Sequence, residues 1–214
     1  FIIDGETVEV DDYVEISGGT LQITSGLLSN THYSDDAITI SGGTLDVDGG
    51  EVRIGDNDGS DYGPDIEMSS GTIDISGGSV NINDELDVNN GTVTISGGTL
   101  SIGTYSGSNL GGGTSTDRFE MDAGTLNLTA GTINIYGQIN SSSYEALDLA
   151  SAVTVNANAN NTINFVAGAG SNDEDMYVIL NGNQLGTVTI SNTSQTVYFE
   201  DDIDVLGDIT INSS

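Results

Sequence analysis

Apolar and polar residues alternate along this chain in short runs, and each run follows a repeated turn. The phrase Ser-Gly-Gly-Thr-apolar-x-apolar, or a close variant of it, begins at residues 17, 41, 69, 76, 89, 96, 122 and 129. An apolar period of two predicts a β-strand with one buried face, and the content of Thr, Val, Ile and Leu agrees with strand preference. Gly residues separate the runs, as expected for turns. The pattern therefore predicts an all-β protein built from short strands.

Residues 69–89 show the length of the larger repeat, because three apolar-x-apolar runs follow one another there without interruption. Three strands per repeat correspond to one coil of a three-sided parallel β-helix, also called a β-solenoid. The same register, continued through residues 1–214, predicts a single domain of about eight coils, roughly 38 Å long at the usual spacing of neighbouring strands.

We name the three predicted stacks of inward side chains faces one, two and three, in the order in which the chain visits them. On face one, the pair Phe1 and Ile3 is followed by Leu21 and Ile23. The first and last inward pairs are Phe1 with Ile3 and Val197 with Phe199 on face one, Val8 with Val10 and Ile203 with Val205 on face two, and Val14 with Ile16 and Ile209 with Ile211 on face three.

The predicted corner between faces one and two receives every long insertion, at about residues 24–37, 55–65, 103–118, 136–146 and 166–177. Loops collected on one side of a solenoid often form its contact surface. Tyrosine suits such contacts because it combines a large rigid ring with a polar tip. The alternative is that the rings only pack their own loops onto the solenoid. The predicted binding residues on this edge are Tyr33, Tyr62, Tyr105, Tyr136, Tyr144 and Tyr177.

Charge and composition exclude several classes of function. The chain has 33 acidic residues against two basic ones, Arg53 and Arg118, for a formal net charge of −31. This charge makes nucleic acid and anionic membranes implausible partners. The chain has no Cys, which excludes disulfides and thiolate chemistry, and no apolar run is long enough to insert into a membrane.

The acidic residues suggest calcium. The outward positions of predicted face two place Glu67, Asp87, Glu120 and Asp148 on successive coils, where like charges repel each other. High salt would screen this repulsion, whereas bound Ca²⁺ would neutralise it, and the alternative is a solvated face that blocks lateral sheet pairing. The sharpest candidate for Ca²⁺ is the loop 55–61, with predicted ligands Asp56, Asp58 and Asp61, although it lacks the closing Glu of an EF-hand. No cofactor is required otherwise.

The repeats resemble those of secreted microbial parallel β-helix proteins, such as surface adhesins and passenger-type domains, which carry short Gly-Gly-Thr repeats. The resemblance covers nearly the whole chain, but its motif, Ser-Gly-Gly-Thr-apolar-x-apolar, specifies a fold and not an activity. It implies an extracellular or cell-surface protein with a structural or adhesive role, and it transfers no functional residue to this chain.

The ends of the predicted solenoid point to self-association. No polar cap or amphipathic helix covers the first strand at Phe1 or the last strand at Ile211, and a bare end coil exposes strand edges and core. Contact between unlike ends produces an open filament. The leading hypothesis is therefore a subunit of a filament or surface fibre, formed by head-to-tail stacking through Phe1, Ile3, Val8, Val10, Ile203, Val205, Ile209 and Ile211.

The main alternative is a fragment of a larger cell-surface adhesin that binds glycan or another surface. Two further alternatives have less support. Ice binding would use the recurrent Thr before the inward pairs, but the second outward position varies among Asp, Asn, Thr, Ser and Gln. A polysaccharide-degrading enzyme would use paired carboxylates, but a lyase for acidic sugars needs cationic residues, and the chain has only two. We therefore expect no enzymatic activity.

Overall fold

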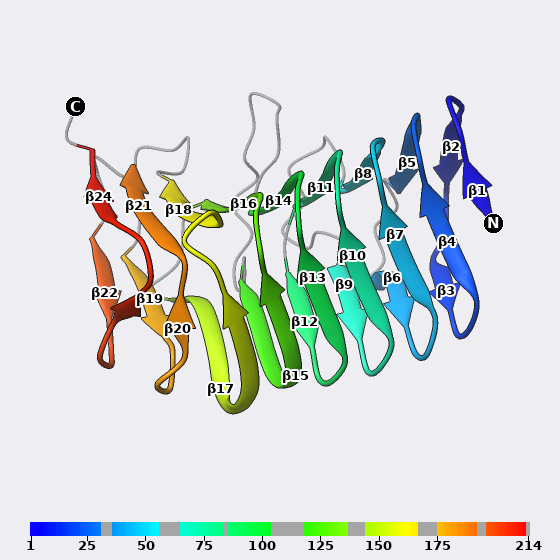
Figure 1. Ribbon diagram of the computed structural model, residues 1–214. Coiled ribbons are helices and arrows are strands. Elements are labelled where there is room, and N and C mark those ends of the chain that lie inside the picture. The colour runs from blue at the N-terminus through cyan, green and yellow to red at the C-terminus, as the bar shows by residue number, and fades with distance from the viewer. Residues whose placement is uncertain are drawn as a thin grey trace.

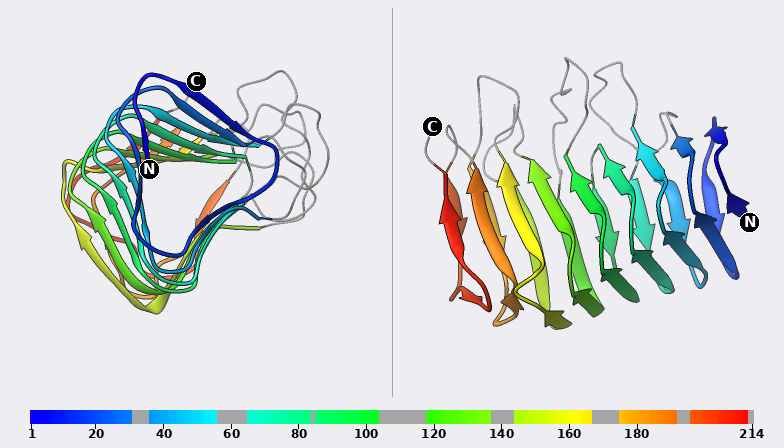
Figure 2. Two further views of the ribbon diagram at one scale, coloured as in Figure 1. Left: turned by 90° about the vertical axis from the view of Figure 1, so that its right-hand side faces the viewer. Right: turned by 45° about the horizontal axis from the view of Figure 1, so that its top comes forward.

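The computed structural model describes residues 1–30, 36–55, 65–83, 85–103, 118–136, 144–166, 175–191 and 196–212. These residues form 24 strands and no helix, and every strand pairing is parallel. The strands wind into a column of stacked coils, and a view along its axis shows a three-sided cross-section (Figure 2). The predicted parallel β-solenoid is confirmed.

Face one is a continuous sheet of nine strands, which lie side by side along one side of the column (Figure 1). Its pairings contain no register shift from one end to the other. The strands, in spatial order, are β2 (Thr7–Val10), β5 (Leu27–Asn30), β8 (Glu51–Ile54), β11 (Ser79–Ile82), β14 (Thr99–Ile102), β16 (Thr132–Tyr136), β18 (Thr162–Val166), β21 (Thr187–Ser191) and β24 (Ile209–Ile211).

Faces two and three belong to one 13-stranded sheet, because two long strands pass around the corner between them. These are β15 (Phe119–Leu128) and β17 (Tyr144–Ala157), and their pairing contains a register shift at the corner. The other strands of face two are β3 (Val14–Ile16), β6 (Asp36–Ile40), β9 (Asp65–Met68), β12 (Leu86–Val88), β19 (Met176–Ile179) and β22 (Val197–Phe199).

Face three begins with β1 and ends with a short separate sheet that follows β17. Its remaining strands are β1 (Ile2–Ile3), β4 (Thr20–Ile23), β7 (Thr44–Val47), β10 (Thr72–Ile75), β13 (Thr92–Ile95), β20 (Gln184–Leu185) and β23 (Asp204–Val205). The segments that the structure does not describe, including most of the predicted loops, connect strands of face one to the next strand of face two, except for the last two residues.

The core is the stack of inward side chains inside the column. The alternation of exposure follows the sequence pattern: in β10, Ile73 and Ile75 are buried, whereas Thr72 and Asp74 are half-buried and face outward. The largest fully buried side chains are Phe119 and Phe165. From Ile38 to Leu180, the inward pairs lie on the faces that the sequence predicts. Each pair stacks in register on the pair of the next coil except in β17 on face three, where Leu126 pairs with Val155 and Leu128 with Ala157.

The predicted faces of the end coils are wrong by one face. Ile3 pairs with Ile23 and Leu21 pairs with Leu45, so these residues lie on face three and not on face one. The cause is β5, a strand inside the predicted loop 24–37. Its second inward residue is Asn30, which is fully buried and donates side-chain hydrogen bonds to the carbonyl oxygens of Asp12 and Ala37. A polar residue at an inward position hides this strand from the apolar pattern.

The same error occurs after residue 180. Strand β20 has one buried apolar side chain, Leu185, and is followed by a buried Gly, so it does not show the apolar-x-apolar signature. The later strands therefore lie one face further on than predicted: β21 and β24 lie on face one, and β22 lies on face two. Two missed strands also explain why face one has nine strands where eight were predicted.

Glycines form the corners that enter and leave face three, because coils stack backbone on backbone there. Gly78 has a φ of +61°, and a Cβ at this position would lie 2.1 Å from the carbonyl oxygen of Gly50 in the preceding coil. Gly19, in the first coil, has a φ of +72°, but a Cβ there would meet nothing within 4 Å. A Cβ at Gly19 would therefore cause backbone strain alone, whereas a Cβ at Gly78 would cause both backbone strain and steric overlap.

We expect Gly19→Ala to lower the free energy of unfolding by about 1 kcal/mol, which is the strain of a left-handed backbone. Gly78→Ala should cost about 3 kcal/mol, because overpacking against Gly50 adds to the same strain. Chemical denaturation of both variants measures the difference. Equal costs would show that the close stacking of the corners does not constrain the residue type.

Candidate functional site

The exposed apolar residues gather in the two end coils. Every large hydrophobic side chain that is exposed in the described part of the chain lies within residues 1–13 or 198–211. Phe1 is 79% exposed and Ile211 is 72% exposed, whereas the inward residues of the middle coils are buried. The full set of exposed large hydrophobic residues is Phe1, Ile2, Tyr13, Tyr198, Leu206, Ile209 and Ile211.

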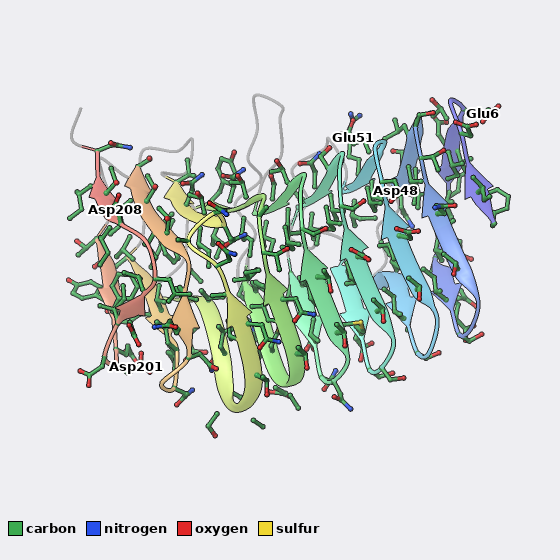
Figure 3. All side chains as sticks on the ribbon, viewed as in Figure 1. Glu6, Asp48, Glu51, Asp201 and Asp208 are labelled. Atoms are coloured by element: carbon green, nitrogen blue, oxygen red, sulfur yellow. The ribbon has the colours of Figure 1, made fainter. Side chains whose placement is uncertain are left out.

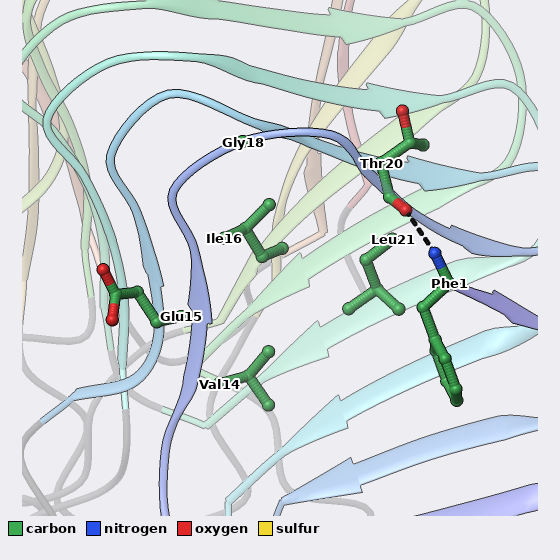
Figure 4. A pocket seen from close by; sticks show the side chains of 7 residues that line it. All are labelled: Phe1, Val14, Glu15, Ile16, Gly18, Thr20 and Leu21. Carbon is green, nitrogen blue, oxygen red and sulfur yellow. Dashed lines mark hydrogen bonds between the residues drawn. The ribbon is translucent and has the colours of Figure 1, made fainter.

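The N-terminal end is hollow. Phe1, Val14, Ile16 and Leu21 line a cavity of about 290 Å³ that opens at this end of the column (Figure 4). The amino group of Phe1 donates a hydrogen bond of 2.8 Å to the carbonyl oxygen of Thr20, which holds the first residue at the rim. The cavity is the open cross-section of the core at the first described coil, whose strands pair with those of the next coil.

The C-terminal end carries two aromatic contacts. Inside the column, the ring of Phe199 packs edge-on against Phe165, with the centroids 6.1 Å apart. On the outside of face two, Tyr198 stacks on Tyr177 of the preceding coil, with the centroids 5.1 Å apart and the planes at 18°. Tyr198 is 43% exposed, so this outward aromatic stack ends at the open end.

The strands of the end coils also have open edges. Each of β1, β2 and β3 pairs with one described strand, and so does each of β22, β23 and β24. Backbone groups on the other edge of a terminal strand need a partner, which is either water or another strand. Both ends therefore combine uncovered apolar side chains with open parallel edges.

The predicted self-assembly residues lie at these ends, with one difference. Phe1, Ile209 and Ile211 are exposed. Ile3 is only 1% exposed, belongs to the core cluster and pairs with Ile23 of the next coil. The remaining predicted residues, Val8, Val10, Ile203 and Val205, are half-buried and pack against the core.

Four of the exposed end residues, namely Ile2, Tyr13, Tyr198 and Leu206, were not predicted from the sequence. Ile2 and Tyr198 occupy the outward position of their strands. An apolar residue at an outward position is a signal that the sequence contains, but it becomes readable only when the register of the end coils is known.

The predicted tyrosine edge is described only in part. Tyr33, Tyr62 and Tyr105 lie outside the described residues. Tyr136 is half-buried at the end of β16, and Tyr144 begins β17, whose backbone pairs with β19, although its side chain is not described. The ring contact found at Tyr177 is with Tyr198, which places Tyr177 in the C-terminal stack.

The predicted calcium ligands Asp56, Asp58 and Asp61 lie outside the described residues. Within the ranges that the structure describes, no group of three His, Cys, Asp or Glu side chains is placed to hold a metal ion. None of the described residues forms a helix that is long and apolar enough to cross a membrane.

The acidic ladder of face two is real, and part of its charge is balanced within the chain. Glu67, Asp87, Glu120 and Asp148 occupy one register position on successive coils. Arg118 forms ion pairs with Glu85 and Glu120, and a looser pair of 3.9 Å with Glu145. Spacing along the chain did not predict this contact, because the three acids belong to three different coils.

The pKa values reflect this balance. Burial, followed by the neighbouring acids, raises the pKa of Glu120, although Arg118 opposes the shift. Burial also raises the pKa of Asp148, and Glu145 adds to the effect. For Arg118, burial lowers the pKa of the guanidinium, but the hydrogen bond and charge of Glu85 and the charges of Glu120 and Glu145 outweigh it and raise the pKa.

A second acidic ladder lies on face three, where Asp46 and Asp74 are in register. Burial raises the pKa of both carboxyls, and Asp48 adds to the shift of each. Gln22 donates hydrogen bonds to Asp46 (3.0 Å) and to Asp48 (2.7 Å), which supplies some compensation on this face.

Comparisons of the chain with protein-family models, with curated protein sequences and with solved structures found no match.

We expect acidification to stabilise the protein. The pKa values of Asp46 and Asp74 are raised in the folded state, so the folded protein binds protons before the unfolded chain does. Stability should therefore rise as the pH falls from 7 through the raised pKa values towards the ordinary value of 3.8. Asp74→Asn should raise Tm at pH 7, since it removes a destabilising charge, and should flatten the dependence of Tm on pH. The rise should be only about 1–2 °C, because solvent screens a surface charge.

Asp11→Asn is the control, since Asp11 is exposed in the first coil and the substitution removes the same charge. Differential scanning calorimetry between pH 4.5 and 7 makes the comparison. A Tm that falls on acidification, or an equal gain from both variants, would contradict the assignment.

Proposed function

We propose that this chain is a non-enzymatic, extracellular structural protein whose solenoids stack end on end into a filament or surface fibre. The supporting observation is that every exposed large hydrophobic side chain of the described residues belongs to one of the two end coils. Faces two and three of the column carry acidic ladders, and the net charge of −31 keeps columns apart laterally. The resemblance of the repeats to secreted parallel β-helices supports the extracellular location.

The partner that fits each end is the opposite end of a second copy. One end offers a hollow lined by Phe1, Val14 and Leu21, and the other presents Ile209 and Ile211. Stacking would bury these side chains and pair the open strand edges in the parallel orientation used throughout the column. Because the two ends differ, the contact repeats without closing.

The order of the strands sets the rotation between copies. The described strands begin on face three with β1 and end on face one with β24, so a continued spiral would next reach face two. A copy that continues the spiral is therefore turned by one face, about 120°, with its β1 on β22, its β2 on β23 and its β3 on β24. An unturned copy would leave a gap one strand wide between β22 and β3.

The turned arrangement also accounts for two outward apolar residues. With Ile3 stacked on Phe199, Ile2 of the second copy lies over Tyr198 and extends the stack of Tyr198 on Tyr177. In the unturned arrangement, Ile2 would lie over the carboxylate of Asp204. The turned copy therefore buries apolar surface where the unturned copy would place it against a charge.

Charge makes the proposed stacking dependent on salt. Acidic residues surround both ends, among them Glu6 at the N-terminal end and Asp201 and Asp208 at the C-terminal end (Figure 3). Two ends of like charge repel each other over about one Debye length, which shrinks from about 30 Å at 0.01 M salt to about 8 Å at 0.15 M. Stacking should therefore be weak at low ionic strength and strong at high ionic strength.

We expect the purified chain to form fibres at high salt and to dissociate at low salt, as measured by electron microscopy and sedimentation velocity. The subunit rise should be about 42 Å, which is the number of stacked strand layers in one copy multiplied by the usual spacing of ~4.8 Å between neighbouring strands. Each copy should be rotated by about 120° relative to the one before it. Ile209→Asp with Ile211→Asp should abolish assembly and leave the monomer folded, because the substitutions place charge in the contact. Thr92→Asp with Thr94→Asp is the control: it adds the same charges at the same spacing on the side of the column and should not abolish assembly.

Single rods at every salt concentration would contradict this proposal. That result would support the alternative in which further coils of a longer adhesin cover both ends.

Disulfide cross-linking tests the rotation. The chain has no native Cys, so introduced pairs report unambiguously. Ile2→Cys with Tyr198→Cys should form disulfides between copies, because adjacent strands place Cα atoms within the range that a disulfide spans. Ile2→Cys with Asp204→Cys is the matched control and should not form disulfides between copies. Covalent ladders on a non-reducing gel from the control pair alone would show that copies stack unturned.

A further inference from the structure

One stretch of the surface differs from the rest of this acidic protein. On face one, the five strands β11, β14, β16, β18 and β21 lie side by side (Figure 1), and two outward positions of each are in register with those of its neighbours. The longer strands β16, β18 and β21 carry a third outward residue, namely Tyr136, Val166 and Ser191. The first outward row consists of Ser79, Thr99, Thr132, Thr162 and Thr187. The second outward row consists of Asn81, Ser101, Asn134, Asn164 and Thr189.

We call these two rows the neutral array. All ten residues are described, and none carries a charge, in a chain with a net charge of −31. Charged residues bound the array at both ends, with Glu51 and Arg53 on β8 and Asp208 before β24. Face two, by contrast, carries the ladder that includes Asp87 and Glu120. On face three the first outward row is also threonine, but the second carries Asp46 and Asp74. Neutrality over five consecutive strands therefore distinguishes this face.

The side chains of the neutral array are held in place. Asn164 donates a hydrogen bond of 2.9 Å to Asn134, and Asn134 donates one of 3.4 Å to Ser101, so the amides link successive coils. Nine of the ten side chains are half-buried and Ser101 is buried. Threonine adds a branched side chain with few rotamers. The result is a rigid pattern of hydroxyl, methyl and amide groups that repeats every ~4.8 Å over about 19 Å.

The chemistry of the array indicates its partner. A charged partner gains nothing from a neutral surface, and the surrounding acids repel anions. A neutral polysaccharide would exchange hydrogen bonds to water for hydrogen bonds to the protein, with little net gain. None of the ten residues of the array is aromatic, and Tyr136, at the next outward position of β16, is half-buried and so offers a sugar little ring surface on which to stack.

An ice surface, as the partner, avoids the loss of hydrogen bonds to water that limits the gain from binding a polysaccharide. Ice is itself water, so the hydroxyl and amide groups keep their hydrogen bonds to water when they dock on a crystal. Each contact is weak, but ten groups in fixed relative positions engage a periodic surface together, and their contributions combine. Charged side chains, which hold their own hydration shells, are absent from all ten positions.

We propose that the neutral array of face one binds the surface of ice crystals. This activity is separate from filament formation, because it uses the side of the column and not its ends. The corrected register carries the inference: it places Thr187 and Thr189 on face one beside Thr162 and Asn164, whereas the sequence pattern placed them on face three.

The test measures inhibition of ice recrystallisation and thermal hysteresis with the full chain. The unmodified protein is expected to be active. Asn134→Asp is isosteric and places one charge in the centre of the array, so it should raise the concentration needed for inhibition by about tenfold or more. Thermal unfolding verifies that the variant folds.

Asn127→Asp is the matched control. Asn127 occupies the equivalent ladder on face three, where it accepts a hydrogen bond of 2.8 Å from Asn156 and donates one of 3.2 Å to Thr94. The same substitution there should leave activity unchanged. Repeating the assays with the Ile209→Asp, Ile211→Asp variant, which removes end stacking, separates ice binding from assembly.

Three results would overturn the proposal. The first is absence of activity in the unmodified chain, and the second is an equal loss in Asn134→Asp and Asn127→Asp. The third is binding to an insoluble neutral polysaccharide, such as cellulose, that Asn134→Asp abolishes while the chain shows no effect on ice. The last result would assign the neutral array to a carbohydrate surface.

Discussion

The stacking of each coil on the next, in register, is the constraint on which the rest of this structure depends. The hydrogen bonds of each strand run along the column to the coils before and after it, so a single coil satisfies neither its backbone nor its apolar side chains. The corners follow from this constraint, because coils at this spacing leave no room for a Cβ at positions such as Gly78. The exposed apolar residues at both ends follow as well, since an end coil lacks one of its two neighbours.

Register stacking multiplies whatever chemistry the outward positions carry. A carboxylate at one outward position of successive coils becomes a ladder of like charges, as on faces two and three, at a cost in repulsion. Burial is the main cause of the raised pKa values of Asp74 and Asp148, and the nearby acids Asp48 and Glu145 add to it. Arg118 reduces that cost on face two by bridging acids from three coils. Where the outward positions are Thr, Ser and Asn, the same stacking produces the neutral array of face one. The acidic ladders of faces two and three and the neutral array of face one therefore give the sides of the column different surface chemistry.

The ends and the neutral array support different proposals because they differ in geometry. The ends are apolar, have open strand edges and are unlike each other, which favours association along the axis. The neutral array is polar, rigid and already hydrogen-bonded, which favours an extended, uncharged and periodic partner. Strand order links the two, because it determines which residues of one copy face another. The placement of β5 and β20 sets this order and, in the proposed stacked pair, would bring Ile2 over Tyr198.

The alternation of apolar and polar residues determined the fold, the three faces and the inward residues from Ile38 to Leu180, because a strand with one buried face must repeat every two residues. It also determined the ladder from Glu67 to Asp148. Only the tertiary structure decided the phase of the end coils. Asn30 can occupy an inward position because the carbonyl groups of Asp12 and Ala37 are brought to it by stacking, and Leu185 forms a strand because its partner strands already exist. The contacts of Arg118, the stack of Tyr177 on Tyr198 and the neutral array also depend on residues from different coils, and no local pattern contains their pairing.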